Sequence, residues 1–249
     1  MSLTNLILQL MQGLGNTLLL FCLTLAFSLP LGMVVTFGRM SKWAPFRHLG
    51  EQAERRRGAE GKPVKTGLAV SLLRRFQPVQ LLSRFFISIL RGTPLMLQVI
   101  VVFFGPYYLF QMRLAASYRI VAVVLAFSIN YAAYFAEIFR AGIESTPVGQ
   151  YEAAQVLGYS KNQTFFKIIL PQMVKRVLPP VTNEVITLVK DTSLAFVITY
   201  TEMFTVAKQI AAAQTTIMPL FAAGVFYFIF NAVVAWAMER IERGLAYYQ

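Results

Sequence analysis

Long apolar runs separated by polar stretches form the main pattern of the chain. Five of these runs are at least as long as the roughly 20 residues that a helix needs to cross a bilayer: 13–38, 85–110, 119–140, 181–206 and 217–238. The pattern predicts an all-α polytopic membrane protein with five transmembrane helices in a single domain, 1–249. We expect a charged cytoplasmic segment over 39–84 and a cytoplasmic loop over 141–180.

Local residue types add detail to these spans. Pro30 and Gly32 predict a kink in the first span, because proline removes a helical hydrogen bond. Residues 76–86 mix apolar and polar side chains and predict an amphipathic helix along the membrane surface. Short loops are expected over 111–118 and 207–216.

The composition also indicates a membrane protein. Hydrophobic residues make up 57% of the 249 residues and charged residues only 14%, whereas soluble domains carry about 25% charged residues. The single cysteine, Cys22, excludes an intrachain disulfide and a cysteine-rich metal site. The single histidine, His48, lies in the charged segment far from other ligand types, so we expect a solvated surface side chain and no metal site.

The positive charge is concentrated on one side of the predicted topology. The net charge is +12, and 12 of the 23 Lys and Arg residues lie between Arg39 and Arg91. A basic block beside membrane spans indicates cytoplasmic topology and contact with the lipid bilayer, and argues against a nucleic-acid partner. Five spans put 19 basic residues on the side of the 141–180 loop and three on the other. We therefore expect a multi-pass cell-membrane protein with its amino terminus outside and its carboxy terminus cytoplasmic.

Ionisable side chains inside the predicted spans mark candidate sites, because a charge in the bilayer needs a partner or water. On the third span, Asn130, Tyr134 and Glu137 share one helical face. A second polar face at helical spacing follows on the fourth span: Asn183, Glu184, Thr187, Lys190 and Asp191. Both faces predict a polar cavity. Side chains of both positive and negative charge in such a cavity suit a free amino acid, which is a zwitterion.

Structural pairing is the alternative role for these charges. Glu137 lies three residues before Arg140, which lies four residues before Glu144, so ion pairs within one helix are expected. Lys190 is able to pair with an acid on a neighbouring helix. The structural role is favoured for the glutamates of the two faces, and both roles stay open for Lys190 and Asp191.

The most distinctive stretch lies in the loop between the third and fourth spans. Residues 152–157 are good helix formers, and Gly158 predicts a helix stop. A second short segment, 159–169, is expected to end at Pro171. The result is a helix–turn–helix hairpin on the membrane surface, and its two adjacent alanines give a low-profile face that a partner could cover closely.

The spacing of this stretch resembles the cytoplasmic loop motif of ATP-binding-cassette (ABC) importer permeases. That motif reads Glu-Ala-Ala, three residues, Gly, nine residues, Ile, one residue and Leu-Pro, and the matching positions are Glu152, Ala153, Ala154, Gly158, Ile168, Leu170 and Pro171. Further stretches resemble the polar amino-acid (histidine, glutamine and arginine) branch of the family: 91–95, 136–143, 149–150, 170–172 and 190–194. The charged segment 50–67 looks longer than the usual first cytoplasmic connection of that family.

This resemblance implies a type I ABC importer fold and a permease function. Two ATPase subunits would bind the hairpin and hold ATP and Mg, because this chain has no Gly-rich phosphate loop and is expected to need no cofactor. A second permease subunit, identical or different, and an extracytoplasmic solute-binding protein complete the implied assembly. The residues implied in ATPase coupling are Tyr151, Glu152, Ala153, Ala154, Leu157 and Gly158. Those expected along the substrate pathway are Glu137, Asn183, Glu184, Thr187, Lys190, Asp191, Thr192 and Ser193.

Two other function classes make different predictions. An ion-coupled amino-acid carrier or a channel would work without an ATPase, but the chain lacks the inverted or tandem repeat of the usual secondary-transporter plan. A membrane-embedded enzyme would need a catalytic set on the spans, and one His with one Cys at these positions cannot supply it. The chain is therefore expected not to be an enzyme.

Overall fold

The computed structural model describes residues 3–45 and 76–245, and every regular element in those parts is a helix. His48 and the charged segment 50–67 lie outside the described residues. In chain order the helices are α1 (Leu3–Met40), α4 (Pro78–Gly92), α5 (Leu95–Phe110), α6 (Tyr118–Glu144), α7 (Val148–Val156), α8 (Lys161–Thr164), η1 (Phe165–Ile169), α9 (Leu170–Asp191), η2 (Thr192–Ile198), α10 (Met203–Gln214) and α11 (Met218–Gly244). The all-α class predicted from the apolar runs is confirmed.

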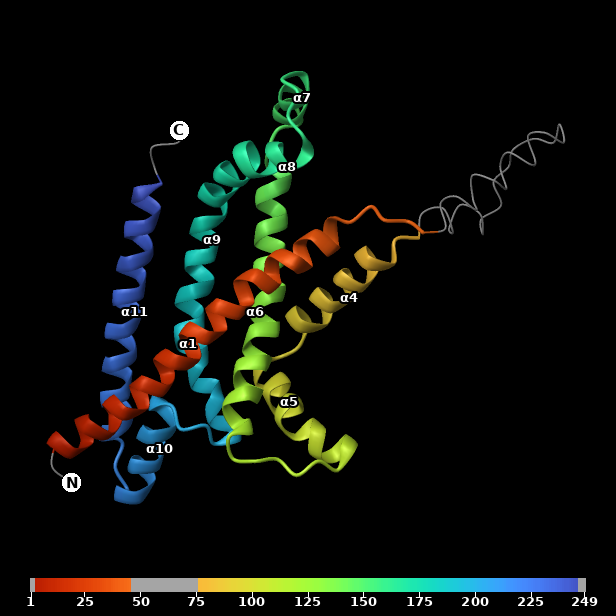
Figure 1. Cartoon of the computed structure of the whole chain (residues 1–249). Helices are drawn as coiled ribbons and strands as arrows, with labels where there is room; N and C mark the ends of the chain where they lie inside the picture. The colour runs from red at the N-terminus through yellow and green to blue at the C-terminus, as the bar shows by residue number, and fades with distance from the viewer. Residues whose placement is uncertain (1–2, 46–75, 246–249) are drawn as a thin grey trace.

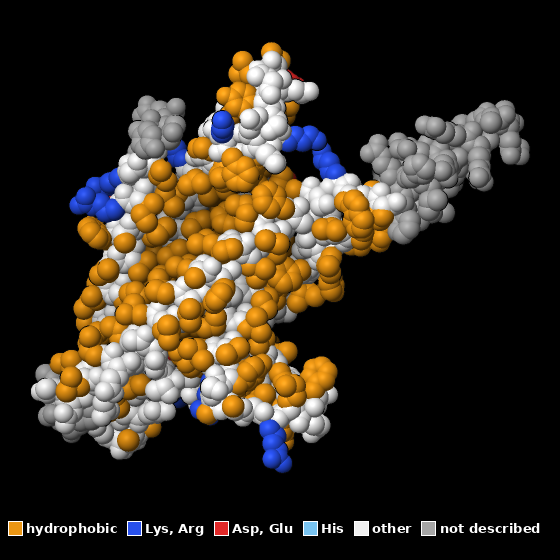
Figure 2. Space-filling view, in the orientation of Figure 1, with side chains coloured by type: hydrophobic (Ala, Val, Ile, Leu, Met, Phe, Trp, Pro, Cys, Tyr) orange, Lys and Arg blue, Asp and Glu red, His pale blue; other side chains and the backbone are white. Residues whose placement is uncertain are grey.

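The long helices form a bundle with a small hairpin at one end. Helices α6, α9 and α11 run side by side, and α1 crosses them obliquely (Figure 1). Helices α7 and α8 lie at the same end as the last turn of α11, whereas α10 and the start of α1 lie at the opposite end. Hydrophobic side chains cover the middle of the visible face, and Lys and Arg lie toward its ends (Figure 2). This distribution is that of a multi-pass membrane protein.

Small side chains let α1 lie directly on α6. Four hydroxyl side chains recur along α1 and are fully buried: Thr17, Thr24, Ser28 and Thr36; of these, Thr36 contacts α6 and Thr17 contacts Met203 of α10. A Cβ on Gly32 would lie 2.8 Å from the Phe135 Cβ, so glycine is needed where the two backbones approach. The Thr36 hydroxyl lies 3.0 Å from the Ala136 carbonyl oxygen across this interface. Helix α1 stays helical through Pro30.

The expected number of five spans is not confirmed. In the described part of the chain, three helices are long and apolar enough to cross a membrane: α1, α6 and α11. A fourth span is obtained if α4 and α5 are taken together, although they are bent by 108° at their break. Helix α9 does not qualify because it carries five ionisable residues: Lys175, Arg176, Glu184, Lys190 and Asp191.

The predicted second span, 85–110, is broken at Pro94, and polar side chains repair the break. Because Pro94 has no N–H, the carbonyl oxygen of Leu90 loses its helical donor. Gln98 Nε2 and Asn130 Nδ2 donate to that oxygen at 2.9 and 3.1 Å, and Asn130 Nδ2 also lies 2.9 Å from Gln98 Oε1. Asn130 belongs to α6, so no local pattern in the second span could reveal that it satisfies the Leu90 oxygen.

The predicted fourth span, 181–206, has different bounds from those expected. Its helix, α9, begins at Leu170 and ends at Asp191. The helix continues through Pro179 and Pro180, at the end of the stretch 141–180 that the sequence pattern predicts as a loop. Neighbouring groups can take over hydrogen bonds that proline removes from a membrane helix, so a proline pair does not fix a helix boundary.

The remainder of that predicted span forms the short helix η2 and the start of a separate helix, α10, which Glu202 caps. Thr199 adopts a left-handed conformation with φ of 55°, and α10 then occupies most of the stretch 207–216 that was predicted as a loop. The Glu202 carboxylate accepts from the N–H groups of Phe204 and Thr205, each at 2.6 Å. A carboxylate cap followed by an alanine-rich run favours a new helix.

Candidate functional site

The hairpin predicted between the third and fourth spans is present, and Gly158 forms its turn. Gly158 follows α7 with φ of +78°. The Gly158 N–H donates to the Gln155 oxygen and the Tyr159 N–H to the Ala154 oxygen, both at 3.0 Å. These two bonds define a Schellman motif at the end of α7. Apart from its chain neighbours, no atom of the described residues lies within 4 Å of a Cβ built on Gly158, so the backbone conformation is what demands glycine there.

The second arm of the hairpin does not end at Pro171, contrary to the prediction. Ser160 begins α8 with a capping box: its hydroxyl accepts from the Gln163 N–H at 3.3 Å, and the Gln163 side chain accepts from the Ser160 N–H at 2.8 Å. The chain then widens into the π-helical turn η1 and continues directly into α9, with Pro171 as its second residue. Proline is tolerated in the first turn of a helix, so Pro171 lies in the first turn of α9 and does not end the preceding segment.

Helix α7 presents an exposed surface at one end of the molecule (Figure 2). Glu152 and Ala153 are exposed, whereas Ala154 is buried and anchors the helix. In the described parts of the chain, Glu152 has no hydrogen bond or ion pair. Partial burial raises the pKa of the neighbouring Tyr151 hydroxyl. Large apolar side chains stand exposed at the two ends of the helix: Val148, Val156 and Leu157.

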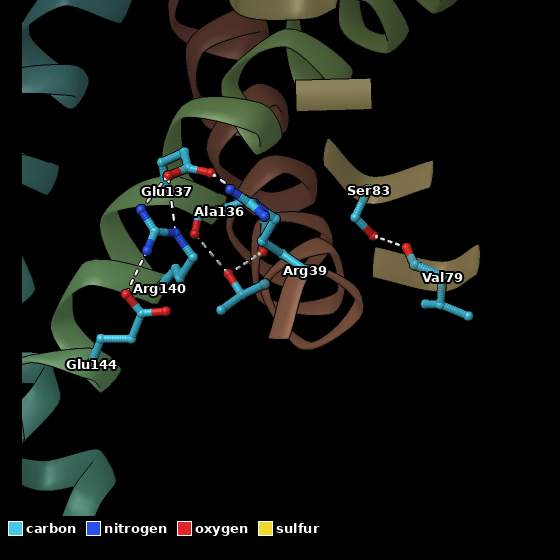
Figure 3. A network of polar contacts seen from close by, with 9 residues as sticks. Arg39, Val79, Ser83, Ala136, Glu137, Arg140 and Glu144 are labelled. Atoms are coloured by element: carbon cyan, nitrogen blue, oxygen red, sulfur yellow. Dashed lines mark hydrogen bonds and ion pairs between the residues drawn. The ribbon is translucent and has the colours of Figure 1, made fainter. Parts of the chain in front are cut away.

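An ion network joins α1 to α6 near the hairpin (Figure 3). Glu137 Oε1 lies 3.4 Å from Arg39 Nε of α1, and Glu137 Oε2 lies 2.7 Å from Arg140 Nη2. Arg140 also pairs with Glu144 one turn further along α6. The pairs predicted within α6 are confirmed, and Arg39 adds a link that spacing within one helix could not show.

A cavity of about 520 Å³ opens beside this network. Its polar side chains include both signs of charge: Arg91, Tyr134, Glu137, Arg140, Arg176 and Glu184. The Arg91 guanidinium lies over the Tyr134 ring, 5.2 Å from its centroid. The cavity thus brings Glu137 and Glu184 together, whereas Asn130 of the same predicted face lies at the Pro94 break. The described parts of the chain bring together no three His, Cys, Asp or Glu side chains that could hold a metal.

Asp191 and Lys190 lie beyond this cavity, at the end of α9. Asp191 is half-buried, and its Oδ2 accepts from the Tyr131 hydroxyl at 2.7 Å. Lys190 is exposed, and the described residues offer it no acid within ion-pair distance on another helix. Among the described residues, the structural pair considered for Lys190 is therefore not formed.

The remaining predicted pathway residues are polar side chains on the same stretch of α9 and η2. Asn183 is exposed, and Thr187 is partly buried. Thr187, Thr192 and Ser193 donate their hydroxyl protons to carbonyl oxygens of the preceding turn at 2.9, 2.7 and 2.8 Å. Hydroxyls satisfied in this way can lie in a membrane at little cost.

Sequence reasoning missed Glu202, which is fully buried. Besides capping α10, its Oε2 accepts from the Tyr227 hydroxyl of α11 at 2.9 Å. The Met203 N–H donates to Thr17 Oγ1 at 3.2 Å and ties the same turn to α1. A signal was available, because a glutamate directly before an alanine-rich helical run is a plausible helix cap.

Comparison with known proteins identifies the family. The family model described as binding-protein-dependent transport system inner membrane component matches residues 65–247. The octopine transport system permease protein OccM of Rhizobium radiobacter is 35% identical over 75% of this chain and 79% of its own length. The arginine transport system permease protein ArtQ of Bacillus subtilis is also 35% identical, over 72% of this chain and 82% of its own length.

Solved structures agree with this assignment. The crystal structure of an amino acid ABC transporter with histidines aligns with a TM-score of 0.76 and 26% identity, over 97% of this chain and 96% of that chain. The MetNI methionine ABC transporter aligns with a TM-score of 0.66 at 15% identity, which supports the fold alone. The chain therefore belongs to the binding-protein-dependent transport system inner membrane components, the permease subunits of ABC importers.

Proposed function

We propose that the chain is the permease subunit of an ABC importer for polar amino acids. The relatives described above are permeases for octopine and arginine, and the aligned crystal structure is of an amino acid ABC transporter with histidines. The observation that carries the proposal is the hairpin. It holds a short exposed helix in a fixed orientation and leaves Glu152 without a partner in the described parts of the chain.

Helix α7 is the docking element for a separate ATPase. Val156 and Leu157 offer exposed apolar area next to a carboxylate that a basic group on the ATPase can meet. Ala153 keeps the surface beside Glu152 shallow, so the partner can approach closely. ATP and Mg bind to the ATPase, and this chain needs no cofactor and performs no hydrolysis itself.

The polar face of α9 lines the substrate pathway. Exposed polar side chains at membrane depth cannot face lipid without a large free-energy penalty, so water or a second permease subunit must cover Asn183 and Lys190. A zwitterionic amino acid needs groups of both signs, and Lys190 with Asp191 supplies one such set. Glu184, in the cavity beside Arg91, supplies another.

The hairpin end of the molecule is cytoplasmic. The apolar runs, read as spans, put most of the basic residues on the hairpin side, and the start of α1 lies at the opposite end. An extracytoplasmic solute-binding protein delivers the amino acid at that opposite end. The carboxy-terminal end of α11 then faces the cytoplasm.

Reconstitution separates this function from that of an ion-coupled carrier or channel. Proteoliposomes would contain either the permease with its solute-binding protein, or the same set with the ATPase that co-purifies with it. Uptake of labelled arginine and glutamine should require both the ATPase and ATP. Uptake by the permease without ATPase, driven by an ion gradient, would favour the carrier and remove the proposal.

A further inference from the structure

The contacts between α7 and the bundle are few, which makes each of them informative. Of the residues in α7, only Ala154 is buried. The helix leaves α6 through Ser145 and returns through the Gly158 turn. A displacement of α7 therefore reaches the long helices through the two chain connections, the packing of Ala154, and the few side-chain bonds that α7 and its connection to α6 make with α9.

The first of these bonds joins α7 to α9. The Gln172 side-chain amide donates to Gln150 Oε1 at 2.6 Å, and it also donates to the Ile168 oxygen at 3.0 Å. A glutamine side chain has two N–H donors, so these two acceptors use the whole donor capacity of Gln172. Gln150 lies in the first turn of α7, and Gln172 lies in the first turn of α9.

The second bond joins α9 to the end of α6. Arg176 Nη1 donates to the Ser145 carbonyl oxygen at 2.7 Å and lies 3.0 Å from Ser145 Oγ. The Ser145 hydroxyl in turn donates to the Gly142 oxygen at 2.7 Å. A positive charge at the carboxyl end of a helix is favoured by the helix dipole, so the Arg176 contact suits the end of α6.

The two bonds act on one face of α9. Gln172 and Arg176 are four residues apart, which places them one turn and about 6 Å apart along the helix. Their partners, Gln150 and Ser145, lie on either side of the connection between α6 and α7. Helix α9 thus holds this connection at two points and carries, further along, the polar face that includes Asp191.

We propose that Gln172 and Arg176 are positioning residues that make α9 follow α7 when the ATPase moves it. This inference rests on the proposed function, because it assigns α7 to the ATPase. It assigns two tasks to different residues. Exposed side chains of the hairpin such as Glu152 bind the ATPase, whereas the hydrogen bonds of Gln172 and Arg176 in α9 transmit the movement to the pathway. Loss of these hydrogen bonds leaves the ATPase bound and active but weakens the coupling of ATP hydrolysis to transport.

The test uses the assembled transporter with its ATPase and solute-binding protein in proteoliposomes. Gln172→Leu and Arg176→Ala should retain the wild-type amount of co-purified ATPase and hydrolyse ATP, while amino-acid uptake per ATP hydrolysed falls roughly five- to tenfold. Gln150→Ala breaks the first bond from the hairpin side and leaves α9 unaltered, so its ratio of uptake to hydrolysis should fall in the same way without any effect of a changed α9 on folding. Lys175→Ala, which removes the basic neighbour of Arg176, should keep the wild-type ratio because Lys175 makes no hydrogen bond or ion pair with the described residues.

Wild-type ratios of uptake to hydrolysis in Gln172→Leu, Arg176→Ala and Gln150→Ala would overturn the inference. Loss of ATPase co-purification in these variants would also overturn it, because the residues would then act in docking. A failure of the proposed function itself looks different, since wild-type transporter would then take up amino acid without ATP. The double variant Gln150→Ala with Gln172→Leu should be no worse than either single change, as expected for two sides of one bond.

Discussion

At the residue scale, the hairpin depends on a backbone conformation more than on a side chain. Gly158 lies in open space, yet its φ of +78° is a value that residues with a Cβ adopt only at a cost in free energy. The Schellman bonds from Gly158 and Tyr159 need that conformation. The motif requires glycine at this point because the turn sets the direction in which α7 projects.

Gly158→Val should therefore distort the turn at a cost of about 1 kcal/mol or more. We expect the variant to insert into the membrane and to lose ATP-driven uptake, because α7 no longer projects correctly toward the ATPase. Gly158→Asn is the matched control, since asparagine tolerates the left-handed region, and it should keep most of the uptake. Equal uptake by the valine variant and the wild type would show that this turn is not needed.

Asp191 allows a residue-scale test of the pathway. Asp191→Asn removes the charge but keeps an oxygen that can accept from Tyr131. If Asp191 faces the pathway, uptake or amino-acid preference should change while ATPase co-purification survives; a loss of about 1.4 kcal/mol in substrate binding is roughly tenfold in affinity. Tyr131→Phe removes the hydrogen bond between the two residues but keeps the Asp191 charge, and it should affect transport less. A general loss of expression in Asp191→Asn, with no selective transport defect, would favour the structural role.

At the element scale, the helices end or bend where polar side chains replace missing backbone partners. The α4–α5 bend uses Gln98 and Asn130 to satisfy the oxygen that Pro94 leaves free. The break before α10 uses the buried carboxylate of Glu202. In both places a group from the interior fixes the geometry, so each break is a stable structural feature.

Glu202→Ala should destabilise the packing of α10 against α1 and α11. The change removes a helix cap and leaves the Tyr227 hydroxyl without its carboxylate, which together cost about 2–4 kcal/mol. The melting temperature of the purified protein in detergent should fall by several degrees. Glu239→Ala, which removes one partner of an exposed pair with Arg243, should change it little. Equal melting temperatures for the two variants would contradict the role given to Glu202.

The sequence predicted the apolar helices and the hairpin better than the breaks between helices. Apolar runs and a motif centred on Gly158 are local signals, and they led to the long apolar helices α1, α6 and α11 and to the turn at Gly158. The bend at Pro94 and the start of α10 depend on contacts between residues distant in the chain, such as Asn130 with Leu90. The cavity that joins Arg91, Glu137 and Glu184 is likewise a product of packing, so spacing within one helix could find only part of it.

At the scale of the whole molecule, the two ends of the bundle differ. The α7 hairpin and the last turn of α11 lie at one end, and the first turn of α1 lies at the other (Figure 1). The ion network of Arg39, Glu137 and Arg140 lies toward the hairpin end and ties α1 to α6 there. The ion network holds α1 and α6 together at that end. The polar face of α9 leaves Asn183 and Lys190 exposed, as expected where a second subunit or water covers it.

Cysteine labelling tests the orientation in the membrane. In a Cys22→Ser background, Gly149→Cys at the hairpin should be shielded from an impermeant thiol reagent in intact cells and should react after permeabilisation. Gln111→Cys, after α5, should react in intact cells because it lies on the other side. Labelling of Gly149→Cys from outside would reverse the orientation and place the ATPase site on the wrong face.

The most direct test of the account is reversal of the charge at Glu152. Glu152→Lys changes an exposed side chain that has no partner in the described parts of the chain, so the protein should insert and fold as the wild type does. We predict that ATPase co-purification or ATP-driven uptake is lost, whereas Arg113→Glu at the opposite end keeps ATPase co-purification. Wild-type co-purification and wild-type uptake, both measured in Glu152→Lys, would contradict the claim that this hairpin couples the permease to an ATPase.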